Sequence, residues 1–290
     1  MAADIRVGIS GWRYAPWRGV FYPPGLPQRA ELAYAAERMT AIEINGSFYA
    51  LQRPTSYRQW ASQVPSGFRF SVKGPRFITH MKKLADARTP LANFFASGVL
   101  ALGPALGPVL WQLPPTLGFD PDRLRRFAAD LPRSTVDAAA LAREHDSRLD
   151  GEGRALTEAE ADLPIRHVLE VRHDSFRTPE FPALLRELGL GLVVADTAGR
   201  WPYLEDVTAD LVYLRLHGDS ELYTSGYDEA ALDRWARRVR TWASGGEPAD
   251  AHRLGGPAVP QEREVWVFFD NDTKVRAPRD AMALIERVGR

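Results

Sequence analysis

Short apolar segments recur along the chain, and most of them end in polar residues. Segments of this length are typical of buried β-strands. Eight strands are predicted, over residues 5–12, 41–45, 68–74, 108–114, 167–173, 190–197, 211–218 and 265–272. The stretches between them have helical character, and several begin with an Asp or Thr followed by Pro or an acid. They predict helices over residues 26–39, 54–64, 91–102, 120–131, 178–189, 228–243 and 278–288.

This alternation also predicts how the strands pair. Strands that alternate with helices, without two-residue hairpin turns, pair in parallel. Eight such units predict closure into a (β/α)8 TIM-type barrel that forms a single domain over residues 1–290. An open doubly wound sheet is the alternative, but no glycine-rich phosphate fingerprint follows any strand. Residues 198–210 have room for only a turn or two of helix. Two insertions interrupt the pattern, at about 133–162, which could add a helix, and at about 244–263, a predicted mobile loop.

The polar residues at the strand ends are the candidate chemistry, because such barrels react at the C-terminal rim of their strands. In "AIEIN", Glu43 and Asn45 share one face because successive side chains of a strand alternate. The same alternation, applied to every strand, predicts a polar ring in the barrel mouth. Its members are Ser10, Trp12, Glu43, Asn45, Ser71, Lys73, Gln112, Glu170, Arg172, Asp196, Arg215, His217, Asp270, Asn271 and Asp272.

Two interpretations of this ring compete. Its charges could pair with one another only to fill the mouth, as structural ion networks do. Burying an ion costs on the order of several kcal/mol unless pairing or function offsets that cost. Three basic groups and three or four acids in one small mouth therefore favour a binding site.

Composition limits the partners. Lys plus Arg and Asp plus Glu number 37 each, so no overall basic field attracts nucleic acid or a membrane. The absence of cysteine excludes disulfides, thiolate metal sites and cysteine nucleophiles. Asp4 and Arg6 interrupt any secretory signal, so a cytoplasmic location is predicted. Residues 94–113 carry no charge, but their Gly-Pro pairs argue against a membrane span.

Three further kinds of site were considered. His80, His173 and His217 follow strands near several acids, but no HxH or HExxH motif is present. A divalent metal is left open, and no other cofactor is assigned. Lys73 could serve as a Schiff-base amine or bind an anion, and without a signature motif anion pairing is favoured. No serine lies in a nucleophile-elbow sequence.

Aromatic residues are concentrated in the loops after the first, second and seventh strands. Aromatic faces beside charged groups suit a sugar, a nucleobase or a stacked nucleic-acid strand. Alternatively, "WRYAPWRGVFYP" forms a rigid loop that packs on itself. The residues are Trp12, Tyr14, Trp17, Phe21, Tyr22, Phe48, Tyr49, Tyr223 and Tyr227.

Several segments together resemble the DUF72 family, also called YecE-like. They are "GISGWRYAPWRGVFYP", "EINGSFY", "FRFSVKGPRFITH", "LEVRHDSF", "VVADTAG", "YLRLHG" and "VFFDND", and they occur in order over nearly the whole chain. The resemblance implies a TIM-type barrel but no activity. Asp270 stands where the family is expected to favour Asn, and Phe176 where it favours Trp. The barrel is also similar in outline to the xylose-isomerase and endonuclease IV group, whose rim carboxylates and histidines hold divalent metals.

The leading hypothesis is an enzyme, of hydrolase, lyase or isomerase type, that acts on a polar sugar- or phosphate-bearing substrate. Its predicted catalytic residues are Glu43, Lys73, Glu170 and His217. Its predicted binding residues are Trp12, Asn45, Tyr49, Gln112, Arg172, Asp196, Arg215, Asn271 and Asp272. The alternatives are nucleic-acid binding with repair-type phosphodiester hydrolysis, and a ligand sensor without catalysis.

Overall fold

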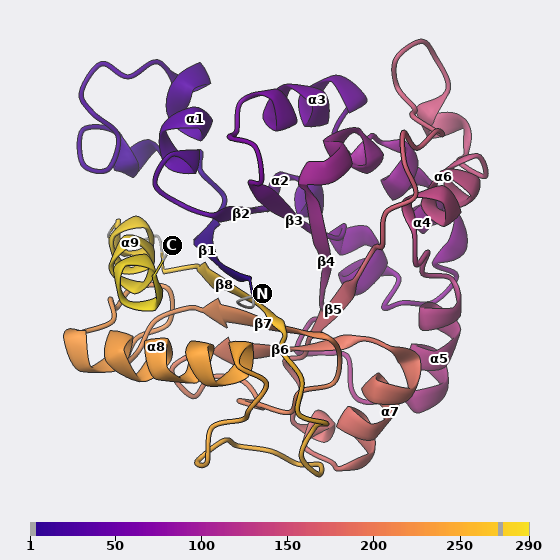
Figure 1. Cartoon of the computed structure of the whole chain (residues 1–290). Helices are drawn as coiled ribbons and strands as arrows, with labels where there is room; N and C mark the ends of the chain where they lie inside the picture. Colours follow the sequence, from indigo (N-terminus) through magenta and orange to yellow (C-terminus); the bar gives the residue numbers. More distant parts are fainter. Residues whose placement is uncertain (1–3, 272–274, 290) are drawn as a thin grey trace.

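A computed structural model describes residues 4–271 and 275–289 as a closed barrel of eight parallel strands, paired in chain order. Figure 1 shows the strands at the centre with the helices around them. The eight predicted strands and the TIM-type barrel are confirmed. The strands are β1 Ile5–Ser10, β2 Ala41–Ile44, β3 Arg69–Lys73, β4 Leu106–Gln112, β5 His167–Glu170, β6 Gly191–Asp196, β7 Leu211–Leu216 and β8 Glu264–Phe269.

The helices cover the outside of the barrel (Figure 1). They are α1 Glu31–Ala36, α2 Gly46–Tyr49, α3 Pro54–Ser62, α4 Arg88–Ala96, α5 Pro121–Ala129, α6 Thr135–Ala142, α7 Glu180–Leu188, α8 Glu229–Ala243 and α9 Arg276–Val288. Short 3-10 helices lie at Ala15–Trp17, Gln28–Ala30, Val99–Ala105, Ser147–Leu149 and Asp174–Phe176, and a π-helix at Phe77–Met81.

Capping residues begin two of these helices as the sequence predicts. Asp120 accepts a hydrogen bond from the Arg123 amide at 3.0 Å before α5, and Asp228 accepts one from Ala231 at 2.7 Å before α8. The insertion at 133–162 contains the added helix α6. Residues 197–210, all of which the structure describes, contain no helix, so β6 and β7 are joined by irregular chain.

Two hydrophobic cores follow from the alternation of side chains along the strands. A small core fills the barrel interior with Ala41, Leu110, Val168, Val193, Ala195, Leu211, Tyr213, Trp266 and Phe268. A larger core lies between the strands and the helices. The interior residues fix the inward face of each strand, and thereby decide which side chains reach the mouth.

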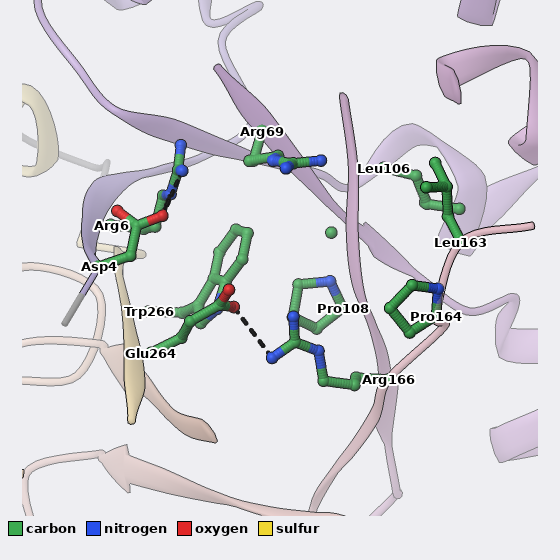
Figure 2. Close-up of a pocket in the computed structure, with 11 residues that line it drawn as sticks. Asp4, Arg6, Arg69, Leu106, Pro108, Leu163, Pro164, Arg166, Glu264 and Trp266 are labelled. Carbon is green, nitrogen blue, oxygen red and sulfur yellow. Dashed lines mark hydrogen bonds and ion pairs between the residues drawn. The ribbon is translucent and has the colours of Figure 1, made fainter. Parts of the chain in front are cut away.

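The N-terminal end of the barrel is hollowed by a pocket of about 110 Å³ (Figure 2). The Trp266 ring lies at this pocket, and the Arg6 guanidinium is 5.9 Å from the ring centroid. Arg166 and Glu264 pair across 3.1 Å, as the dashed line in Figure 2 marks. Charges at this end of such a barrel serve stability, so the reactive end must be sought at the other rim.

No helix within the described residues is long and apolar enough to cross a membrane.

His167 on β5 is buried on the outer side of the barrel and is held as one neutral tautomer. Its Nδ1 accepts a hydrogen bond from Trp111 Nε1 at 3.1 Å, and its Nε2 lies 2.8 Å from the Pro132 carbonyl oxygen, to which it donates. Burial lowers the pKa of His167 from 6.5 to about 4. A second proton on Nδ1 would also point at the tryptophan N–H.

This histidine is expected to make the protein acid-sensitive. Between pH 6.5 and about 4, His167 is protonated in the unfolded chain but neutral in the folded chain. The free energy of unfolding therefore falls as the pH falls. Within this range, such a group lowers the free energy of unfolding by about 1.4 kcal/mol for each pH unit of acidification. In urea titrations across this range His167→Gln should flatten the pH dependence, while the exposed control His252→Gln should not. An equal slope in both variants would contradict the assignment.

Candidate active site

The barrel mouth is built around Arg215, a fully buried residue on β7. Its Nη1 donates to Glu170 Oε2 at 2.7 Å, and its Nη2 donates to Asp270 Oδ2 at 2.9 Å. Its Nε and Nη2 donate to the two oxygens of Glu43 at 3.1 and 2.9 Å. Burial alone would lower the pKa of Arg215, but Glu43, Asp270 and Glu170 raise it well above its usual value. Three strands thus direct carboxylates at one guanidinium.

Glu43 has no free acceptor position in this arrangement. Its Oε1 also accepts from Ser10 Oγ at 3.0 Å, and its Oε2 accepts from the Tyr213 hydroxyl at 2.7 Å. The Tyr213 oxygen lies 2.7 Å from Ser71 Oγ. Glu43 and Arg215 are wholly inaccessible to solvent, and each satisfies the other within the cluster. The predicted binding role of Arg215 stays a prediction, and the structure gives this guanidinium carboxylate partners within the barrel itself.

Glu170 joins the buried cluster to a more accessible cation, Arg172. Arg172 Nε donates to Glu170 Oε1 at 2.9 Å. Burial acts to raise the pKa of Glu170, but Arg172 and Arg215 outweigh it and hold the pKa well below its usual range. Such a carboxylate stays ionised at neutral pH and is a poor proton acceptor. A positioning role suits Glu170 better than the catalytic role predicted from the sequence.

Asp270, which is 16% exposed, and the fully buried His217 complete the cluster. His217 Nδ1 lies 3.0 Å from Asp270 Oδ2, but out of line for a hydrogen bond. His217 Nε2 lies 3.4 Å from Arg215 Nη1. Burial, followed by the charge of Arg215, lowers the pKa of His217, so its imidazole is neutral at pH 7. Burial acts to raise the pKa of Asp270, yet Arg215 and His217 lower it to about 2.

Lys73, the last residue of β3, is the cation that this network leaves unpaired. Its side chain is 8% exposed, and its Nζ makes no hydrogen bond or ion pair with any described residue. The Nζ atom lies 4.4 Å from the centroid of the Phe48 ring. Burial, followed by the charge of Arg215, lowers the pKa of Lys73 to about 8.

Arg172 continues this positive region across the rim. Its guanidinium stacks 3.8 Å from the Trp201 ring centroid, and its Nη2 lies 3.4 Å from the Tyr223 hydroxyl. The pKa of His80 is affected by the same positive charges. Burial and then the charges of Lys73, Arg172 and Arg76 lower the pKa of His80. An anionic group is the ligand that such a rim favours.

Three of the predicted binding residues line a separate pocket of about 270 Å³ beside the mouth: Trp12, Asn45 and Tyr49. The strand alternation ends before each of them. Gly11 has a φ of +82°, which turns Trp12 into the outer core against Trp60. Asn45 has helical dihedral angles and precedes α2, which carries Tyr49. Tyr49 is 68% exposed, and the buried Oδ1 of Asn45 has no partner among the described residues.

Two further predicted residues point away from the mouth. Val193 and Ala195 occupy the inward positions of β6, so Asp196 faces outward. It accepts a hydrogen bond from the Tyr227 hydroxyl at 3.0 Å and lines a pocket of about 380 Å³ with His252 and Arg234. Asn271 donates to Asp280 at 2.8 Å, because the inward position at this strand end belongs to Asp270.

Gln112 and Asp272 complete the predicted set. Gln112 is buried at the end of β4 and pairs in register with Glu170, on the inward side. Asp272 lies outside the described residues. The sequence interpretation missed Tyr213, which is two residues before Arg215 and therefore on the same inward face. The alternation of β7 alone was sufficient to find it.

The aromatic loop before α1 packs on itself, as the alternative interpretation expected. Trp17 and Tyr22 are buried, and the ring centroids of Trp17 and Phe21 lie 5.7 Å apart. Tyr223 does reach the mouth, with its ring centroid 5.3 Å from that of His217.

A protein-bound metal needs several His, Asp or Glu side chains that converge on one point. Within residues 4–271 and 275–289, no three His, Asp or Glu side chains are grouped so that they could hold a metal ion. The carboxylates of Glu43, Glu170 and Asp270 are instead directed at Arg215. In the described part of the chain, the analogy with metal-dependent barrels therefore lacks its ligands.

Known proteins resemble this chain in sequence. "UPF0759 protein YecE" of Escherichia coli K12 is 29% identical over 114 residues, which are 39% of this chain and 39% of that protein. "UPF0759 protein YunF" of Bacillus subtilis is 27% identical over 122 residues, which are 38% of this chain and 40% of that protein. The alignments thus cover well under half the length of these relatives.

Solved structures resemble the whole fold. A DUF72 family protein from Thermotoga maritima superposes with a TM-score of 0.70 at 23% identity, over 98% of both chains. One from Enterococcus faecalis gives 0.67 at 16% identity, over 98% of this chain and 95% of that one. The family model described as "Protein of unknown function DUF72" matches residues 6–290. Because this match covers nearly the entire sequence, the chain belongs to the DUF72 family.

Proposed function

We propose that this protein is an enzyme that acts on a small anionic substrate, sugar- or phosphate-bearing, held at the C-terminal mouth of the barrel. The observation that carries the proposal is the largely buried side chain of Lys73, whose ammonium has no ion-pair or hydrogen-bond partner among the described residues, beside a saturated charge cluster. A lysine that serves only to fill the mouth would be paired with one of its carboxylates, because an unpaired buried charge is costly. An anionic group of a substrate supplies the missing partner.

The other residues divide into two groups by accessibility. Glu43, Glu170 and Arg215 are wholly buried and fix the geometry of the mouth. Lys73 and Arg172 face the substrate, and Arg172 Nη1 has no partner among the described residues. His217 is also wholly buried, but its neutral imidazole lies 3.0 Å from the partly exposed Asp270 carboxylate, which gives it a route for proton transfer to the mouth.

The test is a thermal-shift screen of sugar phosphates and sugar acids against the wild type. A ligand present at 100 times its Kd stabilises by about 2.7 kcal/mol and should raise the melting temperature by about 5 °C. Arg172→Gln should weaken the response to anionic ligands about tenfold, because it removes a charged donor at the rim. Arg177→Gln is the matched control, since Arg177 is an exposed arginine whose ion pair, with Asp174 at 3.1 Å, lies at the surface.

Two outcomes would contradict the proposal. A screen in which no anionic ligand shifts the wild type would remove the small-molecule site. A shift of equal size in wild type and Arg172→Gln would place the ligand elsewhere. Binding to single-stranded DNA that weakens steeply with salt would instead support the nucleic-acid alternative.

A further inference from the structure

We propose that Lys73 is a nucleophile that forms an imine with the carbonyl carbon of a small anionic aldehyde or ketone. This inference rests on the proposed function and specifies its substrate class. It starts from the surroundings of the amine. Lys73 Nζ has no hydrogen-bonding partner among the described residues, and its nearest aromatic neighbour is the Phe48 ring, at 4.4 Å. An amine in such a setting is less solvated than one at the surface, and desolvation favours the neutral, nucleophilic form.

The choice of lysine at this position supports a role beyond charge. Of the 37 basic residues only Lys73, Lys82, Lys83 and Lys274 are lysines, and the rest are arginines. Arginine supplies the other cations of the mouth, Arg172 and Arg215. A side chain needed only for its positive charge could equally be arginine, which cannot lose its proton in a protein. The property that lysine adds is an amine that can be deprotonated and can form a covalent bond.

The charges around the amine are consistent with this role. Lys73 is faced by Arg215 on β7, Glu43 on β2, Glu170 on β5, Asp270 after β8, and His80 after β3. Burial and Arg215 together outweigh the three carboxylates, so the pKa of Lys73 falls to about 8. At that value a substantial fraction of the amine is unprotonated near neutral pH, whereas an ordinary lysine has almost none.

The neighbourhood also provides for the rest of the substrate. Arg172 and Arg76 add positive charge to this region, since their charges, like that of Lys73, lower the pKa of His80. A phosphate or carboxylate would be held there. The His80 ring lies next to Phe48, the aromatic neighbour of Lys73, with 5.2 Å between the two ring centroids. Its Nδ1 lies 2.9 Å from the Thr79 hydroxyl, which fixes the orientation of the ring.

The reaction needs no oxidant or reductant. The lone pair of the neutral amine attacks the carbonyl carbon, and the C=O electron pair moves to oxygen, which takes a proton. The nitrogen loses a proton to give a carbinolamine. A second proton on that oxygen lets it leave as water while the nitrogen lone pair forms the C=N bond. The resulting iminium nitrogen then gives up its remaining proton, which replaces the one used to release water. Amine and carbonyl thus give imine and water, with atoms and charge balanced.

The experiment uses the full-length protein with glycolaldehyde phosphate as the probe, trapped by sodium cyanoborohydride and located by peptide mass spectrometry. One adduct per chain is expected on Lys73, at least about tenfold faster than on any other lysine. Uncharged glycolaldehyde should react more slowly. Lys73→Arg keeps the charge but lacks the amine, and should lose this adduct. Lys82→Arg is the control, because Lys82 lies at the surface with Asp86 at 3.8 Å, and should label as the wild type does.

The outcomes separate this inference from the proposed function. Labelling spread evenly over the lysines, or unchanged in Lys73→Arg, would overturn the imine. Anionic ligands that stabilise the wild type while no adduct forms on Lys73 would also overturn the imine but leave the proposed function intact. If neither stabilisation nor an adduct appears, both are wrong. Trapping that increases with pH through a midpoint near 8 would support the imine, because that is the pKa of Lys73.

Discussion

Replacement of Arg215 by methionine is expected to lower the free energy of unfolding by about 3–5 kcal/mol, because it leaves buried carboxylates without their counter-ion. Arg215 makes ion pairs with Glu43, Glu170 and Asp270 at 2.9, 2.7 and 2.9 Å. Methionine fills similar space but donates no hydrogen bond. Urea unfolding followed by circular dichroism at pH 7 measures the loss. The exposed control Arg177→Met should cost less than about 1 kcal/mol.

The pH dependence of this loss distinguishes unpaired charge from poor packing. In the wild type the pKa values of Glu170 and Asp270 are lowered, so the stability they contribute is present above their unfolded pKa values and is lost as the pH falls through the folded ones, about 2 for Asp270. Without Arg215, burial raises these pKa values. As the pH falls, the carboxylates of the variant become protonated and neutral, which removes the cost of burying their charge. The difference between the variant and the wild type should therefore shrink from pH 7 to pH 5. A difference that does not change with pH would indicate a packing defect instead.

The alternation of strands and the inward face of most strand ends were predictable from the sequence. A strand alternates its side chains wherever its backbone stays extended, so Glu43, Lys73, Glu170 and Arg215 all meet as expected. The same rule misplaced residues where the backbone leaves the strand. Gly11 turns the chain before Trp12, and the chain becomes helical at Asn45. On β6 the polar Asp196 was assumed to face inward, whereas the apolar Ala195 does so.

Which charged residues are free to react was not predictable, because it depends on distances across the barrel. Arg215 and Lys73 are both cations at inward positions of their strands. Three carboxylates surround Arg215, and within the described part of the chain none is paired with Lys73. The sequence pattern predicts on which face of a strand a side chain lies. It does not predict how far that side chain extends into the mouth, or which neighbour it reaches. The distinction between a positioning cation and an available one therefore required coordinates.

Replacement of Gly8 by alanine should also be severe, with a loss of about 3 kcal/mol or more, because the added methyl group has no space. A Cβ at Gly8 would lie 1.7 Å from the carbonyl oxygen of Ala41. That atom belongs to the backbone of β2, which pairs with β1 at this position. A flexible side chain could move aside, but a strand held on both edges cannot do so without breaking the pairing of the barrel.

The matched control is Gly256→Ala. A Cβ there meets nothing within 4 Å, and Gly256 has no positive φ, so the change should shift stability by less than about 0.5 kcal/mol. Equal stability of the two variants in urea would show that β1 and β2 can separate without cost.

The effect of Gly8→Ala should reach the mouth as well, because Ser10 lies two residues further along β1, in register with Glu43. Ser10 Oγ donates to Glu43 Oε1 at 3.0 Å, so forcing β1 away from β2 lengthens that bond and loosens a carboxylate that holds Arg215. Any variant that remains folded should therefore also lose its thermal-shift response to anionic ligands. A folded Gly8→Ala protein with the wild-type response would show that the geometry of the mouth does not depend on the close approach of these two strands.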